Sequence, residues 1–130
     1  MKKNRICFCI LLTFIMVLGG GRLPYLSVEA AAKTEVQIKI GDVNFQASFE
    51  DNKTTKELLK KFPVTYTMSE LNGNEKYKYL SYELPENAKQ VKTIHAGDIM
   101  LYGTDCIVIF YKDFKTSYSY TRLGRITDPS

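Results

Sequence analysis

The sequence predicts a mainly β domain, a small closed barrel of about eight short strands with one short helix. Three observations favour this fold class. Apolar residues alternate with polar ones in several segments, turn residues separate these segments at close intervals, and one stretch alone has helical spacing. The chain of 130 residues provides at most one domain. Closure into a barrel also removes the unpaired strand edges that an open sheet would expose.

A β-hairpin opens the predicted domain. Apolar and polar residues alternate through residues 36–40 and again through residues 43–49. Gly41-Asp42 lies between the two segments, and a two-residue loop with glycine first suits a type II′ turn. Each strand has one apolar face, so both strands are expected to pack on the same core.

The predicted helix comes directly after this hairpin. Asn52 is a favourable N-cap, and a capping box of Thr54 and Glu57 offers an alternative start. Pro63 ends the helix, and its apolar stripe comprises Leu58, Leu59 and Phe62. A helix of about ten residues is not stable alone in water. Its expected role is therefore to cap a sheet or the open end of a barrel.

The second half of the chain supplies the other strands. Val64–Met68 alternates strongly, whereas residues 72–90 are polar and predict loops with a short strand near Tyr79–Leu84. Two further strands are expected at Val91–Ile94 and Ile99–Tyr102.

The last part of the chain is the most apolar. Cys106–Tyr111 is a continuous apolar run, which is typical of a strand buried on both faces. Lys112–Thr116 is predicted to be a polar connection. In the segment that follows, Tyr118 and Tyr120 alternate with small polar residues, as in a half-exposed strand.

The first 30 residues have the order of a secretory signal peptide: a basic head, an apolar run and small residues. Residues 6–18 are apolar apart from Thr13, and this run is shorter than the roughly 20 residues of a spanning helix. Cleavage is expected near Ala30 or Ala32, which leaves residues 31–130 as a secreted or extracytoplasmic domain. An uncleaved N-terminal membrane anchor is the alternative.

Removal of this segment changes the charge and cysteine arguments. It carries four basic residues against one acidic residue, out of a whole-chain charge of +4. The nearly neutral domain gives no electrostatic basis for nucleic-acid binding. The membrane is expected to matter only through the signal peptide. Cys106 alone survives cleavage, so an internal disulfide is impossible and a buried, inert thiol is expected.

Two long segments carry a family resemblance. TMSELNGNEKYKYL (Thr67–Leu80) and HAGDIMLYGTDCIVIFYKDFKTSYSYTRLGRI (His95–Ile126) resemble the bacterial cyclophilin-like domain family, and the likeness extends from about Val36 to Pro129. The resemblance implies a cyclophilin-like β-barrel with a helix that closes one end. It does not imply prolyl isomerase activity.

The residues of true cyclophilin catalysis are missing. In cyclophilins an arginine within a Phe-His-Arg segment donates to the prolyl nitrogen, beside a tryptophan and a histidine. This chain has no tryptophan and no Phe-His-Arg segment, and its single histidine, His95, precedes a turn. No catalytic residue, cofactor or metal site is therefore assigned. One histidine and one cysteine give no ligand spacing for a metal.

A set of aromatic and basic residues is the candidate ligand site. Tyrosine offers apolar area with a polar tip, and arginine beside aromatic rings suits a peptide or carboxylate. The candidates are Tyr66, Met68, Phe110, Tyr118, Tyr120, Arg122 and Arg125. The sequence thus predicts an exported module that binds a peptide, an exported protein or a small ligand without catalysis. The alternatives are barrel packing for the aromatic residues, and a peptidyl-prolyl isomerase that uses one of the two arginines.

Overall fold

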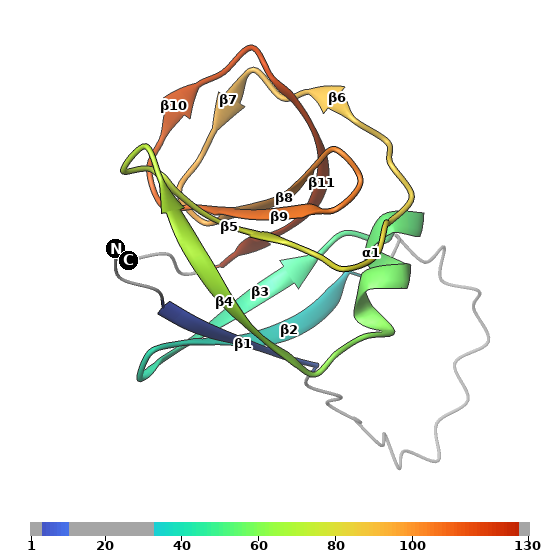
Figure 1. Ribbon diagram of the computed structural model, residues 1–130, viewed down its shortest axis with the longest axis vertical. Helices are drawn as coiled ribbons and strands as arrows, with labels where there is room; N and C mark the ends of the chain where they lie inside the picture. The colour runs from blue at the N-terminus through green and yellow to red at the C-terminus, as the bar shows by residue number, and fades with distance from the viewer. Residues whose placement is uncertain (1–3, 11–32, 128–130) are drawn as a thin grey trace, which may run out of the picture.

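The protein's structure, a computed structural model, describes residues 4–10 and 33–127. These residues form eleven strands and one helix, which confirms the mainly β class (Figure 1). In chain order the elements are β1 (Asn4–Ile10), β2 (Thr34–Ile40), β3 (Val43–Phe49), α1 (Lys53–Leu59), β4 (Val64–Leu71), β5 (Glu75–Tyr79), β6 (Lys89–Gln90), β7 (Thr93–Ile94), β8 (Asp98–Tyr102), β9 (Cys106–Phe110), β10 (Phe114–Lys115) and β11 (Ser119–Ile126).

Eight of the described strands close into an antiparallel barrel. Their order is β3-β2-β1-β4-β5-β9-β8-β11, and β11 returns to pair with β3. Gly124 lies opposite Phe49 at this last seam. A Cβ atom at Gly124 would lie 2.6 Å from the backbone oxygen of Ser48, so the close approach of β11 to β3 requires glycine. The predicted closed barrel of about eight strands is therefore confirmed.

Strand β1 fills the place between β2 and β4. Ile6 lies opposite Ile40 of β2 and Tyr66 of β4. Phe8 is buried, and its ring centroid lies 5.5 Å from that of Phe62 and 5.6 Å from that of Tyr66. Each of the two neighbouring strands forms a backbone ladder with β1. Among the described residues, it is this segment that closes the barrel between β2 and β4.

The same segment is the start of the predicted signal peptide. The expected cleavage positions near Ala30 and Ala32 lie outside the described residues. Removal of the signal peptide therefore stays a prediction. If it occurs, it takes β1 out of the barrel.

Helix α1 lies at one end of the barrel, as expected (Figure 1). Its N-cap is Asn52, whose side chain accepts a hydrogen bond from the Thr55 amide at 2.8 Å, while the Thr55 hydroxyl accepts one from the Asn52 amide at 3.2 Å. The capping box thus pairs Asn52 with Thr55, and the alternative start at Thr54 is wrong because the Thr54 hydroxyl donates to the carbonyl of Pro85. Leu58 is buried in the barrel core.

None of the helices that the structure describes is both long enough and apolar enough to span a membrane.

Residues 75–79 correct the prediction of loops between 72 and 90. They form β5, paired with both β4 and β9, whereas residues 80–88 contain no strand. The charged residues of β5 made the segment look like a loop, although it alternates in the two-residue period of a strand. The expected strand near Tyr79–Leu84 is therefore wrong, and only its first residue belongs to a strand. Part of the expected polar connection at 112–116 is also a strand, β10.

Strand β9 confirms the prediction of burial on both faces. All five of its residues are buried. Ile107 and Ile109 belong to the barrel core, whereas Cys106, Val108 and Phe110 belong to a second apolar cluster on the outer side of the sheet. The continuous apolar run thus contributes side chains to the barrel core on one face and to the outer cluster on the other.

Deletion of residues 1–32 should destabilise the fold. It removes Ile6 and Phe8 from the core and exposes the edges of β2 and β4. Because truncation of one buried isoleucine or phenylalanine costs about 2–5 kcal/mol, the free energy of unfolding is expected to fall by at least about 3 kcal/mol. Urea unfolding followed by circular dichroism measures this loss.

A chain in which a Gly/Ser linker of equal length replaces residues 11–32 is the matched control, because it retains β1. A synthetic peptide of residues 4–10 added to residues 33–130 should restore part of the loss. If the deleted and control chains unfold at the same urea concentration, β2 and β4 close the barrel without β1.

Candidate functional site: a tyrosine-lined groove

A small second layer covers part of the outer face of the barrel. In this layer β7 pairs with β10, and Ile94 lies opposite Phe114 (Figure 1). The ring of Phe110 lies 5.5 Å from Phe114 and 5.5 Å from Tyr120, measured between centroids. The apolar cluster between the layers comprises Ile94, Met100, Cys106, Val108, Phe110 and Tyr120. This packing holds β10 and the segment after it over β5, β8, β9 and β11.

An open groove of about 610 Å³ lies beside this cluster. Five of the nine tyrosines in the sequence line it, together with groups from the β4–β5 turn, β9, β10 and the segment before β11. The tyrosines are Tyr77, Tyr79, Tyr102, Tyr118 and Tyr120. A volume of this size lies in the range of small-molecule sites, about 300–1,000 Å³.

The strand period explains why these tyrosines gather. Tyr77 and Tyr79 are two residues apart on β5, so they lie on one face, with ring centroids 5.9 Å apart. Tyr102, at the end of β8, contacts Tyr118 at 6.1 Å and Tyr120 at 5.7 Å. Two groups of rings from different strands thus face the same groove, and Tyr79, Tyr102 and Tyr118 are exposed there, whereas Tyr120 is buried.

Glu75 places an uncompensated carboxylate in this groove. It is half-buried and has no ion pair or hydrogen bond to another side chain in the described part of the chain. Burial raises the pKa of Glu75, and the nearby charge of Glu70 raises it further. Glu70 itself is satisfied, because Lys76 lies 3.4 Å from it and the hydroxyl of Tyr111 donates to it.

Asn74, the residue before Glu75, adds a second acceptor. Its side-chain oxygen is buried and has no hydrogen-bond partner among the described residues. Its backbone groups are already used, since its amide donates to Leu71 and its carbonyl accepts from Tyr111. A buried polar atom without a partner is uncommon in native structures and calls for an explanation. Because the atom itself is not exposed, a ligand in the groove reaches it only after the Asn74 side chain rotates toward the opening.

The thiol and a phenol of the groove are neutral at physiological pH. Burial raises the pKa of Cys106 to about 11, with smaller contributions from the charges of Asp105 and Glu75. Burial, followed by the charge of Glu75, raises the pKa of Tyr120 to about 12. Cys106 is therefore a thiol and not a reactive thiolate.

The structure distributes the predicted site residues over several places. Tyr118 and Tyr120 line the groove, and Phe110 lies beneath the second layer. Tyr66 and Met68 lie in the barrel interior, on the other side of the sheet. Strand alternation pairs residues that share a face, but it does not say which face is inside. The predicted single aromatic groove is therefore not formed by these residues as a set.

Arg122 and Arg125 line neither the groove nor the second cavity of about 330 Å³ at the barrel end opposite α1. Arg122 is exposed, and its carbonyl accepts a hydrogen bond from the side chain of Asn52 at 3.0 Å. Arg125 forms an ion pair with Asp98, with 2.9 Å between Nε and Oδ1.

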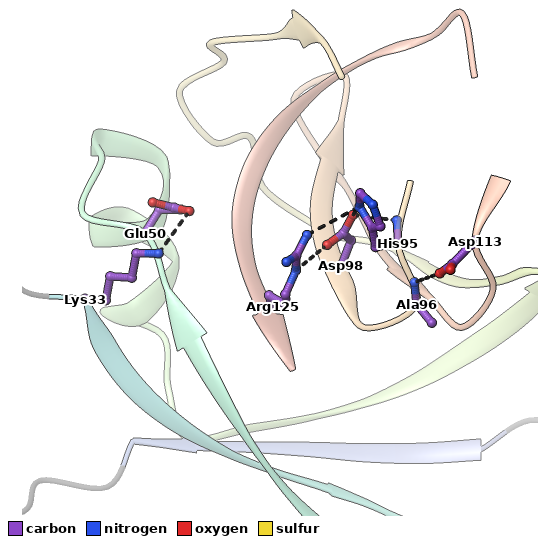
Figure 2. Close-up of polar contacts among 7 residues, drawn as sticks. All are labelled: Lys33, Glu50, His95, Ala96, Asp98, Asp113 and Arg125. Atoms are coloured by element: carbon purple, nitrogen blue, oxygen red, sulfur yellow. Dashed lines mark hydrogen bonds and ion pairs between the residues drawn. The ribbon is translucent and has the colours of Figure 1, made fainter. Parts of the chain in front are cut away.

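Asp98 connects Arg125 to the turn that precedes β8 (Figure 2). Its side chain is only 1% exposed and also accepts the amide of His95 at 2.9 Å. Nδ1 of His95 lies 3.5 Å from the guanidinium of Arg125. In the same turn, the amide of Ala96 donates to Asp113 at 2.7 Å. Through Asp98, the side chain of Arg125 therefore links this turn to β11. Figure 2 also shows the separate surface pair of Lys33 and Glu50, 3.9 Å apart.

Sequence reasoning missed several groove residues. Asn74, Glu75 and Tyr77 fell in a segment interpreted as loop, and Tyr79 fell at the start of a short strand expected near Tyr79–Leu84. The two-residue spacing of Glu75, Tyr77 and Tyr79 was the signal that places them on one face. Tyr102 ends a strand that was correctly predicted, but its alignment with Tyr120 depends on the pairing of β8 with β11.

The two arginines make a matched pair for a stability test. Arg125→Met leaves the buried carboxylate of Asp98 without its cation, so the free energy of unfolding should fall by about 1–3 kcal/mol. Arg122→Met removes the same charge at an exposed position, and it should change the stability by less than about 0.5 kcal/mol. Urea unfolding compares the two variants. Equal stabilities would show that the Asp98–Arg125 pair does not hold the turn.

Glu75→Gln should raise the thermal stability at neutral pH. The pKa of Glu75 is higher in the folded chain, so ionisation disfavours folding once the pH exceeds the unfolded value. Glutamine removes this penalty, and the melting temperature at pH 7 should rise by about 1–3 °C. The gain should shrink toward pH 4, where the carboxyl becomes protonated in both states. Glu83→Gln, at an exposed position, controls for the loss of one charge. A gain that is the same at both pH values would contradict the assigned cause.

Comparison with known proteins agrees with this architecture. The Cyclophilin-like family model matches residues 38–130. Searches of curated proteins and of solved structures give no significant match. The match spans every described element from β3 to β11 and begins within β2. Because it covers well over half of the sequence, and the barrel has the expected eight strands and one helix, the chain belongs to the cyclophilin-like family.

Proposed function

We propose that this protein is an exported module that binds a peptide or another small ligand in the tyrosine-lined groove, without catalysing a reaction on it. The observation that carries the proposal is the groove itself. Five tyrosines from three parts of the fold gather around one opening, with a carboxylate and an amide oxygen that find no partner among the described residues.

The chemistry of the lining supports binding. Tyrosine rings provide rigid apolar area, and their hydroxyls provide hydrogen bonds at low cost in side-chain entropy. Cys106 in the groove has a raised pKa, and so does Tyr120. Neither is activated as a nucleophile or as a base. These two groups therefore support contact with a ligand and not a reaction with it.

The exported part of the proposal rests on the sequence. Lys2, Lys3 and Arg5 precede an apolar run and small residues, in the order that a signal peptide requires. Cleavage after this segment would leave β5, β8, β9 and β11 in place, and these strands carry the groove. The binding surface therefore does not depend on residues that export would remove.

Peptidyl-prolyl isomerase activity with a non-standard active site is the second candidate, and its motivation is the cyclophilin-like barrel together with Arg122 and Arg125. Catalysis must lower a barrier of about 18–20 kcal/mol that amide resonance sets. A groove arginine would be the natural donor to the prolyl nitrogen, but Arg122 and Arg125 lie outside the groove and Arg125 is engaged by Asp98. This geometry makes binding the better supported function.

An NMR titration tests both candidates in one sample. The isotope-labelled full chain is titrated with a short Xaa-Pro peptide, and exchange spectroscopy follows the cis and trans signals of the peptide. We expect shifts at the amides of β5, β8 and residues 116–120 without faster isomerisation. Faster exchange would instead make the protein an isomerase. If no amide shifts, prolyl peptides are excluded, and glycans and other small ligands are screened in the same way.

Tyr102→Leu and Tyr111→Leu form the matched variants. The two tyrosines are similarly exposed, at 45% and 41%, but Tyr102 lines the groove and Tyr111 lines the second cavity. Loss of one stacking ring should weaken binding about 3- to 10-fold for Tyr102→Leu, and Tyr111→Leu should bind as the parent chain does. The opposite pattern would place the ligand in the second cavity.

A further inference from the structure

Two acceptors in the groove have no donor. The carboxylate of Glu75 lies beside the tyrosines without an ion pair among the described residues, and the side-chain oxygen of Asn74 is buried without a hydrogen bond. They belong to consecutive residues, at the turn end of β5. Both residues line the groove, and a carboxylate and an amide oxygen are both acceptors for a donor group that carries several N–H bonds.

The surrounding rings favour a positive charge. The face of a tyrosine ring attracts a cation within about 6 Å of its centroid. Tyr102 and Tyr118 lie in edge-to-face contact at the rim of the groove, with Tyr120 beneath. The groove lining therefore combines tyrosine rings with an acidic acceptor, a combination that suits a flat or compact organic cation.

Among the described residues that line the groove, Lys115 of β10 alone has a cationic side chain. It is exposed, whereas Glu75 is half-buried. Water screens an exposed ammonium more strongly than a half-buried carboxylate. Lys115 therefore weakens the negative potential near the rim but does not neutralise Glu75.

We propose that the groove binds an organic cation with N–H donors, a guanidinium or primary ammonium, through Glu75 and Asn74, with its stem against the tyrosine rings. The cation comes either from an arginine or lysine side chain of a peptide or from a free small amine. This inference rests on the proposed ligand-binding function and names the ligand class of the same groove.

A matched pair of probes tests the cation. N-acetylarginine amide and N-acetylcitrulline amide have nearly the same shape, but citrulline carries a neutral urea, with fewer N–H donors and an acceptor oxygen, in place of the guanidinium cation. Titrated by NMR into the full chain, the arginine probe should bind about 10-fold more tightly, with shifts at the amides of Asn74, Glu75 and Tyr77. Butylguanidine, titrated separately, carries the guanidinium without the peptide groups and without a second charge. Tighter binding of N-acetylarginine amide points to a peptide source, and tighter binding of butylguanidine to a free small cation.

Variants assign the contacts. Glu75→Gln should weaken the arginine probe about 10-fold and leave the citrulline probe unchanged. Tyr102→Leu, which keeps the apolar area but removes the ring face, should weaken the arginine probe about 3-fold more than the citrulline probe. Lys115→Gln should not weaken binding of the cation. Glu57→Gln on α1 makes the same charge change away from the groove and should have no effect.

The outcomes separate this inference from the proposed function. Equal binding of the two amides, or an unchanged affinity in Glu75→Gln, overturns the cation assignment while leaving a ligand-binding groove. Groove shifts with the Xaa-Pro peptide but none with any cationic probe overturn it as well. No shift with any cationic probe overturns the cation assignment, and no shift with any probe, peptide, glycan or other small ligand of the screen contradicts both proposals. A preference for the cation that Glu75→Gln abolishes supports both.

Discussion

Barrel closure is the constraint on which the rest of this structure depends. Each of the eight strands must have two neighbours, and two seams decide whether this is met. At one seam the lack of a side chain at Gly124 lets β11 approach β3. At the other, β1 inserts Ile6 and Phe8 between β2 and β4. Closure fixes which faces of β5, β9, β8 and β11 look inward, and therefore which residues remain outside to form a second cluster and a groove.

The position of β1 sets a physical conflict with the predicted signal peptide. A segment removed on export cannot also complete the mature barrel. The family match starts at residue 38, after β1, so the shared family sequence does not include this strand. In the strand order, β1 is separated from β9 by β4 and β5, and from β11 by β2 and β3. Opening the barrel at β1 would therefore expose core at β2 and β4 but leave intact the four-strand surface that carries the groove.

The fold was more predictable than the site, because several elements follow from local sequence patterns whereas the site depends on how distant strands pair. The hairpin around Gly41-Asp42, the Asn52 cap and the apolar run of β9 are local patterns, and the structure confirms them. Which face of a strand turns inward depends on its partners, and local alternation does not reveal them. Tyr66 therefore lies in the barrel and Tyr118 outside it. The ion pair of Arg125 with Asp98 joins positions 27 residues apart, through the pairing of β8 with β11.

Two glutamates differ in whether neighbouring side chains compensate their charge. Glu70, on β4, is held by Lys76 and Tyr111, and these hydrogen bonds, led by that from Tyr111, lower its pKa. Glu75, five residues later on β5, has a pKa raised by burial and lies among tyrosines. A half-buried carboxylate without a partner opposes folding, since its charge has lost water without gaining a cation. A bound cation would pair with this carboxylate and remove the cost of its burial. That cost is paid in the free protein and relieved only in the complex, so it increases the free energy gained on binding a cation.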